Sequence, residues 1–284
     1  MRSTIVEQGG IKPNARASLS KATRTGTHAR ALFRYQMATK AAGPAQAGEV
    51  RWLGYTPVMT NTPAPAKPSA SVVVVRDGGD ALEVLMLRRN EKIAFHGGAW
   101  VFPGGRIDSE DGAYVAGAEL EVARRAAARE TLEETGLAVS SEVMLPFAHW
   151  TTPVELPKRF ATWFFAAPLM GHHDVRIDNS EIIDYRWLTP NAALALQAAG
   201  ELELPAPTYI TLLGFSSMRN VDALVAHLRE REVQHFVPRL VPIEHGRCTL
   251  YHEDAGYESQ DFNAPGPRHR LIMKAGDWRY IREF

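Results

Sequence analysis

The sequence predicts an α/β fold in which strands and helices follow one another along the chain, with a disordered leader before it and a smaller C-terminal α+β extension after it. Two patterns carry this prediction. Short β-branched and aromatic runs recur between residues 72 and 188, and the run at 159–169 alternates like a strand with two unlike faces. Among these runs lies EVARRAAARETLEETGL, residues 121–137, whose content of Ala, Arg, Glu and Leu is typical of a helix.

The first 70 residues differ in composition from the rest of the chain. They carry ten Lys and Arg but only two acidic residues, and they end in a Pro-Ala stretch. Such a segment has little apolar surface to bury, so we expect a disordered basic leader over 1–70. The main domain is expected over 71–200, with an extension over 201–284 packed on it. We interpret the leader as non-functional, or Met59 as the true start; an organelle transit peptide is the alternative.

Charge, cysteine content and hydropathy exclude several classes of protein. Residues 71–284 hold 22 basic and 30 acidic residues, so nucleic acid is not an expected partner. Cys248 is the only cysteine, which rules out an internal disulfide and favours a reducing, cytoplasmic location. The longest apolar run, 161–170, is too short to cross a bilayer, so no membrane partner is expected. The sequence does not indicate an oligomeric state.

The elements follow from strand-like runs, turn residues and helix boundaries. Ordered structure is expected to begin at Ser71. The helix at 121–137 is expected to end at Gly136, because glycine readily adopts the left-handed conformation found at helix ends. A second helix is predicted from Pro190 to Ala199, since proline fits the first turn of a helix. Strands are predicted at 72–75, 82–88, 100–102, 142–150, 159–169 and 182–188. Beyond residue 200, 205–215 is ambiguous, 221–230 is an amphipathic helix, and 235–283 holds short strands.

Three carboxylates share one face of the predicted helix. Glu130, Glu133 and Glu134 stand at positions i, i+3 and i+4, where like charges repel one another, and the C-terminal end of a helix disfavours anions. A hard divalent cation would reverse both penalties, because Mg²⁺ prefers carboxylate oxygens. The sequence therefore indicates a site for Mg²⁺ or Mn²⁺. The alternative is a solvated acidic face of a surface helix.

The residues around this helix resemble a known family signature. The segment 129–137 resembles the second half of the Nudix box, Gly-x5-Glu-x7-Arg-Glu-U-x-Glu-Glu-x-Gly-U, where U is aliphatic. Glu121 lies seven intervening residues before Arg129, as the box requires, and 102–105 resembles the Gly-Gly loop that opens it. Fifteen residues, not five, separate Gly105 from Glu121, which indicates an inserted loop near 108–117 at little cost in closure entropy. Thr131 at an aliphatic position is a milder departure.

The resemblance implies a Nudix α/β/α sandwich with a mixed sheet between its helices. It also implies the hydrolysis of a diphosphate bond in a nucleoside diphosphate derivative, with Mg²⁺ or Mn²⁺. Glu130, Glu133 and Glu134 are then expected to hold the metal, helped by a backbone carbonyl of Gly104 or Gly105. By the same resemblance, Glu121 and Arg129 pair with each other and brace the helix.

Other site residues are expected from loops and strand ends. Glu181, at the start of a strand, is the first candidate for the catalytic base or a further ligand, and Glu155 is the second; the alternative for Glu181 is a solvent-facing strand-end carboxylate. Arg159 is the candidate for a substrate phosphate, because its planar fork of donors matches phosphate oxygens. Its alternative is a surface position on a strand. His252, His269 and Arg270 are interpreted as surface residues, with contact to a ligand as the alternative.

The glycine-rich segment 88–105, called the glycine loop below, and the residues just before it also partly resemble the signature of the coenzyme A diphosphatase subgroup. Leu85, Arg89, Gly98 and 102–105 fall in register with it, whereas four positions do not. Those positions are Met86, Leu87, Asn90 and Ala94, the last standing where the subgroup has a second arginine. The inserted loop and the later segments 149–153 and 159–160 are similar to the peroxisomal branch of that subgroup. The resemblance implies coenzyme A or acyl-CoA as substrate.

Two further interpretations remain open. ADP-ribose or NADH hydrolysis is the alternative within the enzymes, and a non-catalytic ligand-binding regulator is the alternative outside them. All the carboxylates of the box are present, which favours the enzyme.

Overall fold

The larger sheet is built around β1, Lys67–Asp77, in the computed structural model, which describes residues 63–93, 95–171 and 173–284. Its Val72–Val75 run is fully buried, as a strand covered on both faces must be. Val72 and Val74 belong to the core beneath one helix, and Val73 and Val75 to the core on the opposite face. Residues 1–62 of the predicted leader, including Met59, and the subgroup position Ala94 lie outside the described residues.

The prediction that ordered structure begins at Ser71 is wrong by four residues. β1 begins at Lys67 because β6, Phe160–Pro168, runs parallel to it over its whole first part, in a register that starts with Lys67 opposite Phe160. The Lys67 amide also donates to the carbonyl of Arg159 over 2.9 Å. The start of this strand was not predicted because Pro65, Lys67 and Pro68 precede the valine run and break the apolar pattern.

The sheet is mixed, as predicted. β2, Leu82–Arg89, runs antiparallel to β1 on one side, and β6 runs parallel to it on the other. The strand order is β3-β2-β1-β6-β5-β8, with β4 paired to β1 and β7 paired to β2. The remaining strands are β3, Trp100–Val101; β4, Gly104–Arg106; β5, Leu145–Thr151; β7, Ile182–Leu188; and β8, Gln234–Phe236.

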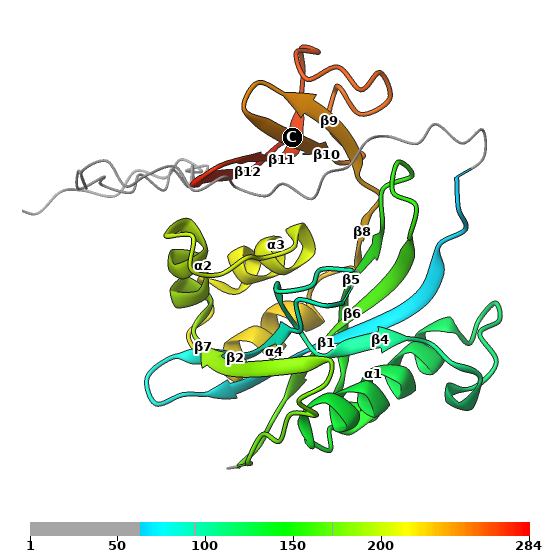
Figure 1. Cartoon of the computed structure of the whole chain (residues 1–284), viewed down its shortest axis with the longest axis vertical. Helices are drawn as coiled ribbons and strands as arrows, with labels where there is room; N and C mark the ends of the chain where they lie inside the picture. The colour runs from blue at the N-terminus through cyan, green and yellow to red at the C-terminus, as the bar shows by residue number, and fades with distance from the viewer. Residues whose placement is uncertain (1–62, 94, 172) are drawn as a thin grey trace, which may run out of the picture. The chain divides into compact units, whose positions relative to one another are not determined.

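Helices cover both faces of this sheet, which confirms the α/β/α sandwich (Figure 1). The helix α1, Glu119–Thr135, lies on one face, and its small side chains Ala123, Ala126 and Ala127 let it approach β1 closely. It ends at Gly136 with φ 70°, the predicted left-handed cap. The opposite face is covered by α2, Pro190–Ala198; α3, Ala206–Phe215; and α4, Val221–Arg229. The segment that was ambiguous in sequence is therefore helical.

The C-terminal part forms a second, four-stranded antiparallel sheet, as the predicted short strands suggested. Its order is β12-β11-β10-β9. The strands are β9, Arg239–Ile243; β10, Gly246–Leu250; β11, Arg268–Lys274; and β12, Asp277–Glu283. The Tyr209 hydroxyl of α3 donates to the carbonyl of Trp278 over 3.1 Å, which ties this sheet to the helices. No helix in the described part of the chain has the length and apolar character needed to span a membrane.

Two residues expected at the surface are buried in this second sheet. His269 and Arg270 are each only 3% exposed, so that interpretation is wrong, whereas His252 is exposed as expected. Arg270 makes a two-point ion pair with the buried carboxylate of Asp254, with Nε–Oδ2 at 2.7 Å and Nη2–Oδ1 at 2.6 Å. An arginine is buried only when such a partner satisfies it, and this partner lies 16 residues away in sequence.

Candidate active site

The glycine loop approaches both β1 and the end of α1 closely. Gly104 has φ 150°, and a Cβ atom there would overlap the carbonyl of Ala70 in β1. Its amide donates to Oε2 of Glu134 over 2.9 Å. A Cβ atom on Gly105 would overlap the carboxylate of Glu130. Gly104 is therefore required by its backbone conformation and by the β1 carbonyl, whereas a side chain at Gly105 would displace Glu130. The loop is held against two of the three predicted metal ligands.

The three glutamates occupy unlike environments. Glu134 is buried, Glu130 is half-buried, and the side chain of Glu133 is 57% exposed. Burial raises the pKa of Glu134 to about 8, although the Gly104 amide opposes this shift. Burial also raises the pKa of Glu130, against the opposing effect of Arg129. Both carboxylates thus lie where their charged forms lack a sufficient positive partner.

Arg129 is the hub of an ion-pair network, but its main partner is not the predicted one. Its Nε and Nη2 donate to the two oxygens of Asp111, each over 2.9 Å. Its Nη1 donates to Glu130 over 3.0 Å and to Glu133 over 3.2 Å. Glu121 instead lies 3.6 Å from Arg124 with its side chain 61% exposed, so the predicted Glu121–Arg129 pair is wrong.

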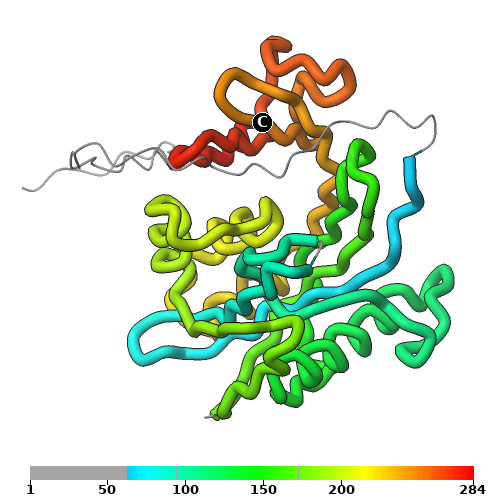
Figure 2. The backbone as a smooth tube through the Cα atoms, viewed as in Figure 1, coloured from blue at the N-terminus to red at the C-terminus, as the bar shows by residue number. Residues whose placement is uncertain are grey.

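The reason for this exchange is the inserted loop. The loop after β4 turns and leads back into α1 (Figure 2), and it contains a short 3₁₀ turn at Ser109–Asp111. That turn places the carboxylate of Asp111 against Arg129, and Asp111 takes the pairing role expected of Glu121. The sequence identified the insertion but gave no reason to single out Asp111, and the one signal was an acidic Asp-Ser-Glu-Asp run within it.

Arg89 and Glu181 join the same site, at the ends of two paired strands. Arg89 ends β2 and Glu181 precedes β7, and their side chains lie 3.5 Å apart. The amide of Asn90 donates to the carbonyl of Glu181 over 2.8 Å, which fixes the two strand ends together. The charges of both side chains act on Glu134. Arg89 lowers the pKa of Glu134 and Glu181 raises it, and each effect is smaller than that of burial.

The structure does not bring Arg159 and Glu155 into this network. Arg159 donates to the backbone carbonyls of Thr152, over 3.1 Å, and Ala64, over 2.7 Å. It immediately precedes β6 next to Lys67, whereas Gly105 pairs with Ala70 farther along β1. Glu155 has both carboxylate oxygens buried without a hydrogen-bond partner in the described part of the chain.

The donors fit a hard divalent cation in kind, but they are not gathered around one point. Within the described ranges, no three His, Cys, Asp or Glu side chains are close enough to hold a metal ion. The cause is visible in the network: Glu130 and Glu133 turn towards Arg129, and Glu134 accepts from Gly104. A cation facing Glu134 would relieve the cost of its burial, and the exposed side chain of Glu133 would have to leave Arg129 to reach it.

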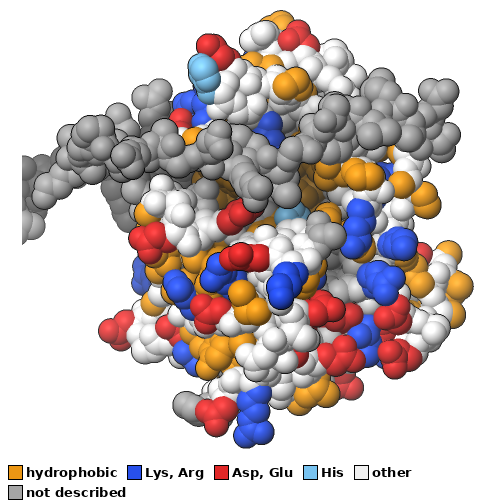
Figure 3. All heavy atoms as spheres, viewed as in Figure 1, with side chains coloured by type: hydrophobic (Ala, Val, Ile, Leu, Met, Phe, Trp, Pro, Cys, Tyr) orange, Lys and Arg blue, Asp and Glu red, His pale blue; other side chains and the backbone are white. Residues whose placement is uncertain are grey.

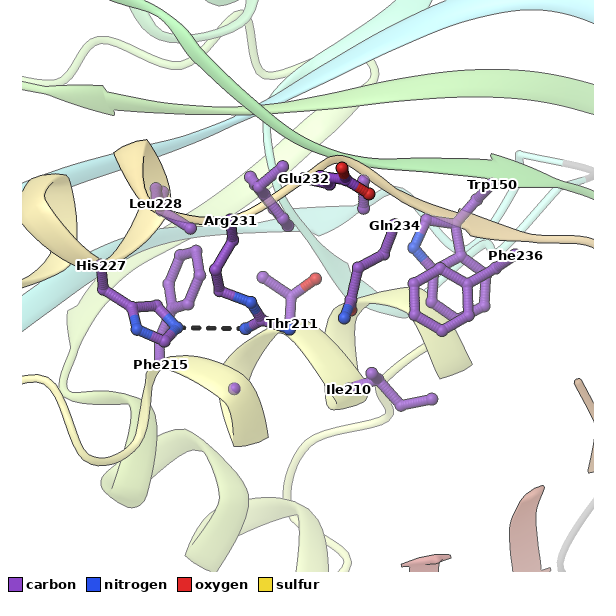
Figure 4. A pocket seen from close by; sticks show the side chains of 13 residues that line it. Trp150, Ile210, Thr211, Phe215, His227, Leu228, Arg231, Glu232, Gln234 and Phe236 are labelled. Carbon is purple, nitrogen blue, oxygen red and sulfur yellow. Dashed lines mark hydrogen bonds between the residues drawn. The ribbon is translucent and has the colours of Figure 1, made fainter. Parts of the chain in front are cut away.

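Two hollows in the surface are lined by residues other than the three glutamates of α1. An open cleft of about 380 Å³ is lined by Arg88, Glu91, Gly97, Gly98, Trp100, Arg186, Gly200, Glu201 and Glu203. It borders the loop that follows Arg89, and the Arg186 guanidinium lies 4.7 Å from the centroid of Trp100. A small apolar pocket of about 50 Å³ lies between β5, α3 and α4, where Arg231 and His227 are hydrogen-bonded (Figure 4).

Charged side chains of both signs gather over α1 and the loop before it, as Figure 3 shows. A mixed sheet between helices, with a glycine loop held against a glutamate-rich helix end, defines the class as a Nudix domain. The NUDIX domain family model matches residues 65–208, half of the sequence, and the chain belongs to this family. Nudix hydrolases generally use divalent metals such as Mg²⁺ or Mn²⁺.

Two curated relatives and one solved structure are similar to this chain. "Putative nudix hydrolase 7" of Caenorhabditis elegans is 24% identical over 174 residues, which are 49% of this chain and 57% of that protein. "Peroxisomal coenzyme A diphosphatase ndx-8" of the same organism is 30% identical over 95 residues, 34% of this chain and 37% of that protein. The match thus spans little more than half of the first relative and about a third of the second. The crystal structure of a NUDIX hydrolase from Alicyclobacillus acidocaldarius has the same fold, with TM-score 0.52 and 22% identity over 60% of this chain and 97% of that one.

Proposed function

We propose that this chain is a diphosphatase that uses Mg²⁺ or Mn²⁺ to hydrolyse the diphosphate bond of a nucleoside diphosphate linked to another group. The observation that carries the proposal is the contact of the glycine loop with Glu130 and Glu134 at one end of α1. The Arg89–Glu181 pair is near enough for both charges to act on the pKa of Glu134. Membership of the NUDIX domain family supports the same reaction. A purely structural acidic helix gives no reason for two carboxylates to be buried against a glycine loop.

The residues of the chain divide the work between binding and orientation. When bound, the cation supplies positive charge that neutralises the diphosphate and lowers the pKa of water. Glu130, Glu133 and Glu134 are the proposed ligands, and the Gly104–Gly105 backbone leaves room for the phosphates to approach. Arg89 offers a planar donor group to a phosphate oxygen, and its Nε is buried without a partner in the described residues.

Glu181 is the proposed general base. Its side chain is 65% exposed and lies beside Arg89, so it can accept a proton from a water at the edge of the site. Glu155 is the weaker candidate, because it has no described contact with the glutamates of α1. The test of this assignment is Glu181→Gln, for which we expect kcat to fall while the affinity for Mg²⁺ is kept.

A finer proposal is that the substrate is coenzyme A or an acyl-CoA, cut to 4′-phosphopantetheine and 3′,5′-ADP. The similarity of the glycine loop to the coenzyme A diphosphatase signature and the similarity to a relative with that name both support it. The open cleft beside the loop after Arg89 offers space for the part of a substrate beyond the diphosphate. The alternative substrate is ADP-ribose or NADH, and the alternative role is a ligand-binding regulator.

The experiment is a substrate panel with the purified full chain and Mg²⁺. CoA, dephospho-CoA, ADP-ribose, NADH and dinucleoside polyphosphates are compared by kcat/KM, with EDTA as the metal-free control. The proposal expects turnover that EDTA abolishes, with CoA preferred over dephospho-CoA. Equal turnover of ADP-ribose and no advantage of the 3′-phosphate would reject coenzyme A and keep the diphosphatase. Tight binding of a panel member without turnover would instead support the regulator.

A further inference from the structure

Arg129 presents two different edges of its guanidinium group to two sets of carboxylates. On the first edge, Nε and Nη2 donate to the two carboxylate oxygens of Asp111, with both hydrogen bonds at 2.9 Å. The remaining nitrogen, Nη1, donates to Glu130 and Glu133. The carbonyl of Arg106, just after the glycine loop, accepts a further bond from Nη2 over 3.0 Å. One arginine therefore connects the inserted loop, the glycine loop and the proposed metal ligands.

Asp111 is the fixed end of this arrangement. Its side chain is only 3% exposed, and its Oδ2 also accepts the amide of Asp108 over 2.8 Å. Its backbone carbonyl accepts Nε of Arg125 over 2.6 Å. A few residues on, the Tyr114 hydroxyl accepts a hydrogen bond from the indole of Trp163 over 3.2 Å, which anchors the same loop to β6.

We infer that Asp111 is a positioning residue of the active site, which orients Arg129 and, through it, Glu130 and Glu133. It makes the pair with Arg129 that the family signature assigns to Glu121. The inference rests on the proposed function, because the glutamates it positions are the proposed metal ligands. The inserted loop thus supplies the residue that orients Arg129.

The physical reason lies in the geometry of the pairing. A carboxylate that meets two nitrogens of a guanidinium fixes both the plane and the direction of the group. Without the charge of Asp111, the strongest remaining ion pairs of Arg129 are those to Glu130 and Glu133, so it competes with a cation for both carboxylates. Loss of an outer partner of this kind typically costs about 10- to 100-fold in metal affinity or activity.

The test compares Asp111→Asn with Glu121→Gln in the full chain. For Asp111→Asn we expect kcat to fall at least about 10-fold and the Mn²⁺ concentration for half-maximal activity to rise, while KM for substrate changes little. Asp111→Glu, which keeps the charge, restores part of the loss. Glu121→Gln remains close to the wild type.

Two control variants separate positioning from simple folding of the loop. Glu110→Gln removes the same charge from the neighbouring position, where the side chain is 71% exposed and 3.9 Å from Arg129. Tyr114→Phe removes the other anchor of the loop without touching Arg129. We expect both to keep kcat within about twofold of the wild type, since exposed pairs and single neutral hydrogen bonds contribute little. A loss in Tyr114→Phe equal to that in Asp111→Asn would reduce Asp111 to a loop-folding residue.

A readout without catalysis keeps the inference apart from the proposed function. In protein labelled with ¹⁵N-arginine, the Nε–H of Arg129 is expected to exchange slowly with solvent in the wild type, in Glu121→Gln and in Glu110→Gln. In Asp111→Asn it is expected to exchange rapidly. If no substrate is turned over but this pattern is found, the proposed function fails and the pairing role stands. Slow exchange and full activity in Asp111→Asn, or their loss in Glu121→Gln, would overturn the inference.

Discussion

The Cα atom of Gly105 lies directly against the carboxylate of Glu130, so closely that a single methyl group on Gly105 would overlap both carboxylate oxygens. This contact sets the distance between the glycine loop and α1. Any residue with a side chain at position 105 would therefore displace Glu130, a proposed metal ligand.

Gly105→Ala is therefore expected to lower kcat by roughly 10- to 100-fold, since misplacing a reacting group by about an ångström has effects of that size. The measurement is kcat at saturating Mg²⁺, with the melting temperature as a check on folding. Gly78→Ala, where the overlapping atoms are the flexible end of Glu83, is the matched control. Unchanged turnover in Gly105→Ala would show that Glu130 moves aside without cost.

Removing either of two glutamates is expected to lower kcat by at least about 100-fold, because a metal ligand is lost with almost no change in volume. The variants are Glu133→Gln and Glu134→Gln, measured at saturating Mg²⁺. Glu142→Gln, an exposed carboxylate in a turn, is the control. Wild-type turnover in both glutamine variants would contradict the metal assignment.

Breaking the buried pair in the second sheet is expected to destabilise the protein by about 3–5 kcal/mol, because Asp254→Asn leaves the Arg270 charge buried without a partner. Chemical denaturation at pH 7 measures this loss. Asp277→Asn, which removes one partner of an exposed pair with Arg279, is expected to change stability by less than about 1 kcal/mol. Similar losses in the two variants would contradict the structural difference between the pairs.

The same pair predicts a pH dependence with a definite sign. Burial alone would raise the pKa of Asp254, but hydrogen bonds from Arg270 and from two backbone amides hold it below its ordinary value. The resulting stabilisation is fully present above the unfolded-state pKa of about 3.9 and is lost as the pH falls towards the lower folded-state pKa. The stability of Asp254→Asn should therefore fall less steeply than that of the wild type below pH 4. Parallel curves would refute this linkage.

Cys248 is expected to resist thiol reagents in the folded protein. It is fully buried, and burial raises the pKa of its thiol to about 12, so the reactive thiolate is scarce at neutral pH. Ellman's reagent should label no thiol in the native chain and one thiol per chain after denaturation. Rapid labelling of the native protein would show that the second sheet opens readily.

The parts of the fold that follow from local chemistry were predictable from the sequence. The composition of 121–137 and Gly136 placed α1 to within two residues at each end, and the valine run placed the centre of β1. Thr131 departs from the aliphatic pattern, yet it is buried because its hydroxyl bonds to the carbonyl of Ala127 one turn earlier. A local hydrogen bond thus makes a polar residue equivalent to an apolar one.

The contacts that the sequence did not reveal are those between distant segments. Asp111 reaches Arg129 through the conformation of an inserted loop, and Asp254 reaches Arg270 across 16 residues. Fixed spacing in a motif says nothing about an insertion that supplies a replacement partner. The proposed roles of Glu130, Glu133, Glu134 and Glu181 remain predictions for the experiments above.

The last strand of the larger sheet, β8, comes from beyond residue 208, where the family match ends, and it runs parallel to β5. Phe236 of β8 stacks on Trp150 of β5 with ring centroids 3.9 Å apart. A fragment cut at the family boundary would leave the backbone of β5 open and its tryptophan without this cover. Open strand edges with apolar faces recruit further chains, so we expect a fragment that ends at residue 208 to aggregate more readily than one that extends through Phe236.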